Sequence, residues 1–329
     1  MYKTAQIIRD WMLPGAIVLG VSLYLLYHFL PALHQYERIL HLLVSEGQRV
    51  VIATLLFFQF VKISPHDLKL TRWHLLALAF QVGCFLILTA LVSAMPRGDA
   101  RMLLECAMLC LVCPTASAAG VITEKLGGDL AGTVSYVVMI NVAATFLIPL
   151  VIPMVNPSAT MGFWAYVGHI ALKVFPVLVL PGLVAWTFRY TTHRFQRRLM
   201  RWSVCSFYVW GVGLTLAMVL ATRALMESRL GMWTIAGIVA VSMFCCFIQF
   251  FTGRRIGRTP LDNLTAGQAL GQKNTGFLIW LGYNYMTPVT SVAGGLYAVW
   301  QNLFNSWELY KKQHPGQMRA SRKTSTIEG

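Results

Sequence analysis

Charged side chains are scarce in this sequence. Asp, Glu, Lys and Arg make up 12% of its 329 residues, whereas hydrophobic residues make up 57%. A water-soluble domain has about a quarter of its residues charged, so the composition excludes an ordinary soluble protein. The mean hydropathy of +0.60 agrees, and we expect much of the surface to face lipid.

Acidic residues are less than half as numerous as basic ones. The chain has 12 Asp and Glu against 27 Lys and Arg, which gives a formal net charge of +15. The basic residues do not form a patch with interleaved aromatic side chains, as a nucleic-acid surface would. They stand in short clusters between apolar runs, which is typical of a membrane topology signal. We therefore expect no nucleic-acid partner.

Sequence motifs of enzymes, a disulfide framework and a cleavable signal are missing as well. No apolar run holds paired carboxylates, an H-E-x-x-H motif or a Ser/His/Asp set, so we expect neither an enzyme nor a bound cofactor. The seven cysteines are odd in number and lie inside apolar runs, which argues against a disulfide framework. The first apolar run, Met12 to about Leu30, is longer than the core of a cleavable signal and lacks a clear cleavage site.

The apolar runs divide the chain into ten predicted helices, each near the roughly 20 residues that cross a hydrocarbon core. We therefore expect an all-α integral membrane protein with a single membrane domain over residues 1–310. Residues 311–329 form a basic cytoplasmic tail that we expect to be disordered. The second run is short and has an alternative start near Leu43. The predicted spans are Met12–Leu30, Arg49–Ile63, His74–Met95, Met102–Leu126, Leu130–Met154, Phe163–Trp186, Trp202–Ala221, Met232–Phe251, Leu264–Leu281 and Met286–Leu309.

The distribution of Lys and Arg orients these spans. If the N-terminus is cytoplasmic, 19 of them fall on the inside and 6, Arg49 among them, on the outside, with Lys173 and Lys273 left within spans. Cytoplasmic loops carry such an excess of basic residues. We therefore predict a multi-pass protein of the inner cell membrane with both termini in the cytoplasm.

Two of the spans are interrupted by Pro or Gly together with hydroxyl and amide side chains. The interruptions are Cys113–Gly120 in the fourth span and Gly267–Gly276 in the ninth, about 155 residues apart. Each lies in the fourth span of a set of five, and an odd number of spans forces two repeats into opposite orientations. The pattern predicts inverted five-helix repeats over about 10–155 and 160–310, with a transporter site at the broken helices. The alternative is that Pro and Gly only kink these helices.

A broken helix leaves backbone N–H and C=O groups free at the middle of the membrane, where they need polar partners. Lys273 stands out because a cation in mid-span costs several kcal/mol and is by default a functional candidate. Its ammonium could neutralise the carbonyl ends of the first half-helices in place of sodium, or it could snorkel to an interface. The neutral candidates at the breaks are Thr115, Ser117, Gln268, Gln272 and Asn274.

Other polar residues within spans have two interpretations. Gln81, Thr133 and Asn141 either face a ligand or form interhelical hydrogen bonds. Glu105 and Lys173 lie closer to span ends, where snorkelling is easier, and we interpret both as structural.

One helical face carries three cysteines. Cys106, Cys110 and Cys113 recur at i, i+4 and i+7. Such thiols either bind soft metals or metalloids or serve as small packing residues. We predict no metal centre and keep metalloid or inorganic-ion efflux as an alternative function.

Several motifs resemble the bile acid:sodium symporter family over roughly residues 10–310. They are Cys113-Pro114 followed by Thr, Ala and Ser, then Val121–Thr123, Gly128–Ala131 and Gln272–Gly276. The resemblance implies ten spans in a core and a panel domain, with broken helices four and nine crossing. It also implies sodium-coupled uptake of bile acids or other organic anions.

The chain departs from that family at the implied sodium site. The sodium-binding Ser and Asn fall at Ala119 and Gly120, which have no side-chain oxygen. Thr133 keeps a hydroxyl, but the next Thr is Val137. Gln81 retains the ligand of the third helix.

The acidic residue of the ninth span is also replaced. The family's Glu falls at Gln268 or Ala269, and its neighbouring Gln falls at Gln272 or Lys273. A site that loses a carboxylate and gains an ammonium should hold sodium poorly.

The function that we predict is secondary active transport of an organic anion, bile-acid-like or a small carboxylate, by alternating access. Sodium, a proton or no ion at all remain open as the coupling partner. A non-transporting membrane sensor or an enzyme is the rival class. The expected partners are the substrate anion and the lipid bilayer. The candidate binding residues are Gln81, Thr115, Ser117, Thr133, Gln268, Gln272, Lys273, Asn274 and Thr275.

Overall fold

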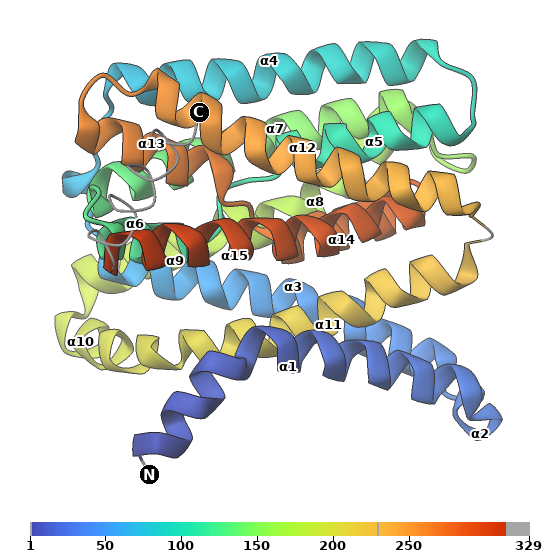
Figure 1. The fold of residues 1–329 in the computed structure, drawn as a ribbon, viewed down its shortest axis with the longest axis horizontal. Coiled ribbons are helices and arrows are strands. Elements are labelled where there is room, and N and C mark those ends of the chain that lie inside the picture. The colour runs from blue at the N-terminus through green and yellow to red at the C-terminus, as the bar shows by residue number, and fades with distance from the viewer. Residues whose placement is uncertain (1, 229, 314–329) are drawn as a thin grey trace, which may run out of the picture.

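The computed structural model of the protein describes residues 2–228 and 230–313, and that part of the chain is helical without a β-strand (Figure 1). Three 3₁₀ turns, η1 (Pro65–Asp67), η2 (Ser203–Cys205) and η3 (Pro288–Thr290), join some of the helices. The helices are α1 (Tyr2–Phe29), α2 (Pro31–His34), α3 (Glu37–Lys62), α4 (Arg72–Ala94), α5 (Asp99–Val112), α6 (Ala119–Leu126), α7 (Leu130–Val155), α8 (Phe163–Leu178), α9 (Leu180–Thr191), α10 (His193–Trp202), α11 (Ser206–Glu227), α12 (Met232–Ile256), α13 (Pro260–Gly271), α14 (Thr275–Tyr285) and α15 (Ser291–Gln313).

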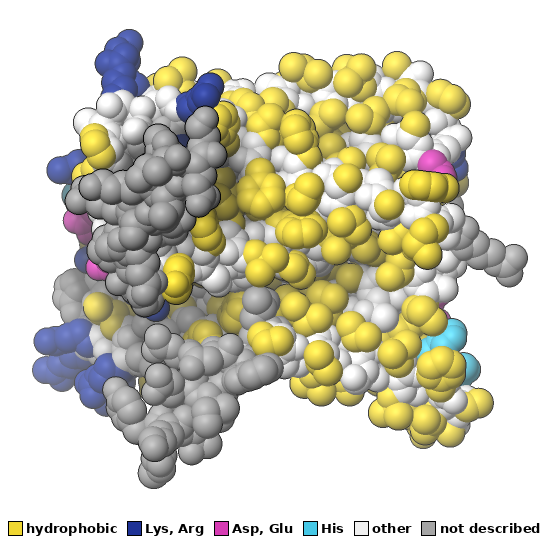
Figure 2. Space-filling view, viewed as in Figure 1, with side chains coloured by type: hydrophobic (Ala, Val, Ile, Leu, Met, Phe, Trp, Pro, Cys, Tyr) yellow, Lys and Arg dark blue, Asp and Glu magenta, His cyan; other side chains and the backbone are white. Residues whose placement is uncertain are grey.

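Several helices are long and apolar enough to cross a membrane. Within the described residues these are the five helices α3, α4, α7, α11 and α12, and the pair α8–α9, bent by 41°, adds a sixth span. Figure 2 shows hydrophobic side chains over most of one broad face, whereas most of the Lys and Arg visible there gather at one end. An all-helical membrane fold is thus confirmed.

The helices pack in two layers, which lie at opposite edges of Figure 1. Helices α1, α3, α9 and α11 pack against one another and form what we call the α3 layer. Helices α4 to α7 and α12 to α15 form the α13 layer. The layers meet where α3 and α11 contact α14, while α8 packs against both α3 and α7. This arrangement places the broken helices of the α13 layer next to the α3 layer.

Helix α3 corrects the predicted second span. It begins at Glu37, 12 residues before Arg49 and ahead of the alternative start at Leu43. Hydropathy started the span too late because residues 37–48 mix polar and apolar residues. The polar side chains of Ser45 and Gln48 are nevertheless buried on the helix. Arg49 therefore lies in the middle of α3, and its predicted place on the outside is wrong.

Two further segments differ from the sequence-based boundaries. The basic stretch after the sixth span forms the separate helix α10. Residues 311–313 of the predicted tail belong to α15, and the rest of that tail lies outside the described residues.

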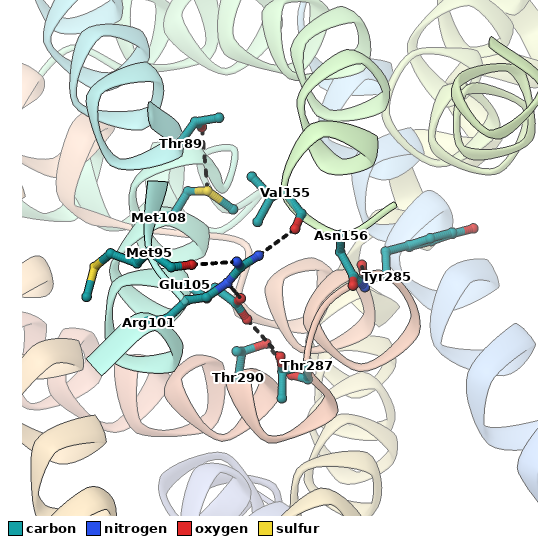
Figure 3. A network of polar contacts seen from close by, with 10 residues as sticks. All are labelled: Thr89, Met95, Arg101, Glu105, Met108, Val155, Asn156, Tyr285, Thr287 and Thr290. Atoms are coloured by element: carbon teal, nitrogen blue, oxygen red, sulfur yellow. Dashed lines mark hydrogen bonds and ion pairs between the residues drawn. The ribbon is translucent and has the colours of Figure 1, made fainter. Parts of the chain in front are cut away.

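A buried ion pair ties helix ends together at the side of the molecule away from α10 (Figure 3). Arg101 donates from Nε to Glu105 Oε1 over 3.1 Å and from its terminal nitrogens to the carbonyls of Met95 (2.9 Å) and Val155 (2.6 Å). Thr287 donates to Glu105 Oε2 over 2.8 Å. These contacts join α4, α5, α7 and the turn before α15, and they place Glu105 in a structural network.

Glycine lets α12 and α13 approach most closely at Gly253. A Cβ on Gly253 would lie 2.8 Å from the Cα of Gly267 and would also clash with the Ala266 carbonyl. Small residues permit such close helix packing in membranes. The broken helix α13 is held against α12 by this contact.

We expect Gly253→Ala to destabilise the protein by about 1–3 kcal/mol, the usual cost of overpacking. Thermal unfolding of the detergent-purified protein measures the effect. The control is Gly83→Ala in α4, where an added Cβ meets nothing within 4 Å. Equal unfolding temperatures for the two variants would show that the close contact does not exist.

Candidate functional site

The structure breaks both of the spans that the sequence singles out. Residues 113–118 separate α5 from α6, and residues 272–274 separate α13 from α14. Pro114 accounts for the first break because it has no N–H and disfavours helical conformation in the residue before it. Asn274 starts the second half-helix: its Oδ1 accepts the N–H of Phe277 over 3.2 Å, which is an N-cap.

The two linkers pair with each other. Thr115 and Lys273 form an antiparallel bridge, and the N–H of Asn274 donates to the carbonyl of Pro114 over 2.8 Å. Backbone groups freed by one break are thus satisfied by the other, as they must be away from water. Segments far apart in the sequence therefore share one site.

Gln81 satisfies the carbonyl end of α5. Its Nε2 donates to the carbonyls of Val112 (3.3 Å) and Cys113 (3.0 Å), and its Oε1 accepts the hydroxyl of Tyr136 over 2.8 Å. The buried amide is engaged at both ends. It links α4, α5 and α7, and its oxygen is not open to a ligand in this state.

Hydroxyl groups satisfy the carbonyl end of α13. Thr115 Oγ1 donates to the carbonyl of Ala269 over 2.6 Å, and Tyr297 Oη donates to that of Gly271 over 2.7 Å. Ala269 needs this donor because the N–H of Lys273, its helical partner, donates instead to Gln301 Oε1 over 2.8 Å. The carbonyl groups at the C-terminal ends of α5 and α13 thus accept hydrogen bonds from uncharged side chains.

Lys273 lies at the centre of the crossing with 0% of its surface exposed. Both backbone groups of Lys273 bind the Gln301 side chain: Oε1 accepts the Lys273 N–H, and Nε2 donates to the Lys273 carbonyl over 3.3 Å. Its Nζ has no hydrogen-bond partner in the part of the chain that the structure describes. The expectation that the ammonium binds the carbonyl ends is therefore wrong, because Gln81, Thr115 and Tyr297 occupy them.

Thiols surround this ammonium. The thiols of Cys110 and Cys113 at the end of α5, and of Cys245 and Cys246 in α12, lie close to Lys273. No three His, Cys, Asp or Glu side chains in residues 2–228 and 230–313 are placed to hold a metal ion. Two of the three cysteines on the face found in the sequence, Cys110 and Cys113, are therefore near Lys273, together with two adjacent cysteines of α12.

A carboxylate that sequence reasoning missed reaches the site from α15. Glu308 is 6% exposed, accepts Gln268 Nε2 over 2.8 Å and pairs with Arg254. Gln268 Oε1 in turn accepts Gln272 Nε2. The expectation of a site without a carboxylate is wrong, because Glu308 takes a place beside Gln268.

The sequence did hold a signal for this residue. Tyr297, Gln301, Asn305 and Glu308 recur at helical spacing along α15, and all four are buried. Asn305 Oδ1 finds no partner among the described residues. The buried polar side chains of α15 thus reach α13 and the linker after it at Gln268, Gly271 and Lys273.

The remaining candidates fall into two groups. Thr275 opens α14, where its N–H donates to the Lys273 carbonyl over 2.9 Å, and Ser117 is half-buried in the first linker. Thr133 instead donates to the Asp129 carbonyl one turn back in its own helix, over 2.9 Å. The crossing therefore brings together all nine candidates except Thr133, with Gln81 as a structural cap.

We expect Thr115→Val to destabilise the protein by about 1–3 kcal/mol, the cost of an unpaired buried carbonyl, here that of Ala269. Thr133→Val is the matched control, because the Asp129 carbonyl that it frees still accepts the Thr133 N–H over 3.1 Å. Thermal unfolding in detergent compares the two. A Thr115→Val protein as stable as the control would contradict the assigned hydrogen bond.

Comparison with known protein families matches residues 11–294 to the SBF-like CPA transporter family. A search of curated proteins found no match to the chain.

Proposed function

The chain belongs to the SBF-like CPA transporter family, and we propose that it is a secondary transporter that carries a small organic anion by alternating access. Membership of this family, together with several apolar helices, identifies a multi-pass membrane transporter of the bile acid symporter type. The observation that carries the proposal is the pairing of two broken helices through Thr115 and Lys273. Half-helix ends buried at such a crossing are typical of transporter sites.

We infer ten spans in two inverted repeats. Beyond the membrane-capable helices, α1, the pairs α5–α6 and α13–α14, and α15 supply four more spans of similar length. The two broken pairs are then the fourth span of each five, as inverted repeats require. Moving Arg49 into α3 removes one basic residue from the outer side, so the charge bias favours cytoplasmic termini in the cell membrane more strongly.

The two layers supply the moving parts. The broken helices belong to the α13 layer, and α3 and α11 contact α14 from the α3 layer. Rocking of one layer against the other would expose the crossing to each side of the membrane in turn, as in other transporters with inverted repeats.

Lys273 is proposed to replace the coupling sodium. A buried ammonium would repel a second cation at this site. The oxygen ligands are also missing, because Ala119 and Gly120 have none in their side chains and the Gln81 oxygen accepts from Tyr136. Transport should then be coupled to protons if Lys273 releases its proton during the cycle, or be uncoupled if Lys273 stays charged.

We expect uptake by the wild type to persist when choline replaces sodium, and Lys273→Gln to lower it at least about tenfold, roughly 1.4 kcal/mol in the barrier. Proteoliposomes loaded with the purified protein and supplied with labelled cholate or benzoate measure both. The control variant is Lys69→Gln, an exposed residue outside the helices. A steep sodium requirement would refute the replacement, and no uptake of either probe would contradict the proposed substrate class.

A further inference from the structure

Arg49 is a second cation within a membrane helix. It lies 12 residues after the first residue of α3 and 13 before the last, hence about 18 Å from either end at 1.5 Å per residue. Its side chain is 15% exposed. Charges at this depth are costly and mark sites that bind substrates or ions.

The charges around Arg49 do not balance. Glu46, one turn earlier in α3, pairs with it, and Lys173 of α8 places its Nζ 3.9 Å from the same carboxylate. Glu46 and Lys173 are 46% and 40% exposed. Two cations thus share one carboxylate, and because charged groups do not face hydrocarbon unsolvated, the open side of this cluster must meet water. The cluster lacks one negative charge.

The guanidinium also lacks an acceptor. Glu46 is bound through Nη1, and Nη2 donates to the Lys173 carbonyl over a long 3.4 Å. The buried Nε meets no acceptor among the described atoms. A guanidinium offers its donors as a planar fork that fits a carboxylate in a bidentate manner. The Nε side is thus a donor position left open, in the sense that no described acceptor fills it, and it is shielded from solvent in this structure. The exposed side of the cluster is at Glu46 and Lys173.

The open position lies at the contact between the two layers. The guanidinium is 5.6 Å from the ring centre of Trp280 in α14. The neighbouring Gln48 is buried against the first turn of α14, where a Cβ on Gly276 would lie 2.6 Å from its Nε2. Gln48 Oε1 is a further buried atom without a described partner. The N-terminal end of α14 adds a partial positive charge that favours an anion.

We propose that Arg49 and Lys173 bind the carboxylate of the transported molecule, and that Glu46 is the internal counter-ion that this carboxylate displaces. The inference rests on the proposed function and names its substrate class: a monovalent organic carboxylate. The substrate replaces one carboxylate by another beside two cations, so a monovalent anion fits. Lys273 cannot take this part because it is fully buried.

The position of the cluster couples binding to movement. Arg49 belongs to the α3 layer and lies 5.6 Å from the ring centre of Trp280 in the α13 layer, so a carboxylate bound to Arg49 lies at the contact between the layers. Glu46 keeps the guanidinium compensated when the carrier is empty, which lowers the cost of its return. Substrate and Glu46 thus alternate as partners of one cation.

Binding of benzoate and cholate to the purified protein, with benzamide and methyl cholate as uncharged isosteres, tests the inference by calorimetric titration. We expect the wild type to bind the carboxylates and not the isosteres. Arg49→Gln should weaken carboxylate binding at least tenfold, and Arg49→Lys, which keeps the charge but loses the fork, should weaken it less. Glu46→Gln should strengthen it, because the competing carboxylate is removed.

Arg38→Gln, an exposed arginine in the first turn of the same helix, is the matched control and should bind as the wild type does. Unchanged binding by both Arg49→Gln and Glu46→Gln would overturn the inference, as would a wild type that binds neither carboxylate. If Arg49→Gln does not fold, the opposite effects of Glu46→Gln and Arg49→Lys decide. If uptake requires sodium but Arg49→Gln still weakens carboxylate binding, only the proposed role of Lys273 is refuted. If uptake does not require sodium and Arg49→Gln leaves carboxylate binding unchanged, only the inference about Arg49 is refuted.

Discussion

The structure depends on one constraint: polar backbone groups away from water must be paired within the protein. Breaking a helix in mid-membrane frees such groups, and two breaks placed together let each linker pair with the other, as Thr115 and Lys273 do. Gln81 and Tyr297 then take the carbonyls that remain. Because the donors come from α4, from the linker after α5 and from α15, the crossing holds most of the α13 layer together.

The same constraint explains where the charges lie. Arg101 and Glu105 neutralise each other at one end of the molecule, and Arg254 neutralises Glu308 near the other. These pairs are compensated and hold helices in place. Lys273 lacks an acidic partner among the described residues, which is costly unless the charge is used. A stabilising role accounts for the compensated pairs but not for this lysine.

Sequence reasoning located the breaks because their causes are local. Pro114 excludes a helical hydrogen bond, and Asn274 caps the helix that follows it. It missed Glu308 because nothing near that residue in the sequence indicates that its carboxylate contacts Gln268 of α13. It misplaced Arg49 because hydropathy ends a span at a polar stretch, whereas the buried Gln48 beside it shows that tertiary packing continues the helix. The place of Glu308 and the start of α3 both depend on contacts with residues that are distant in the sequence.

In the proposed carrier, the two unusual cations would have different roles in the two layers. Lys273 lies in the α13 layer without exposed surface, so it would act through its electrostatic field and the conformation of the crossing. Arg49 lies in the α3 layer beside the half-exposed Glu46 and Lys173, so it would act by direct contact with the anion. An anion bound between the layers would then be attracted to Arg49 directly and to the α14 N-terminus through its partial positive charge. On this proposal the charge of the substrate, and not a sodium ion, would stabilise the closed arrangement of the layers.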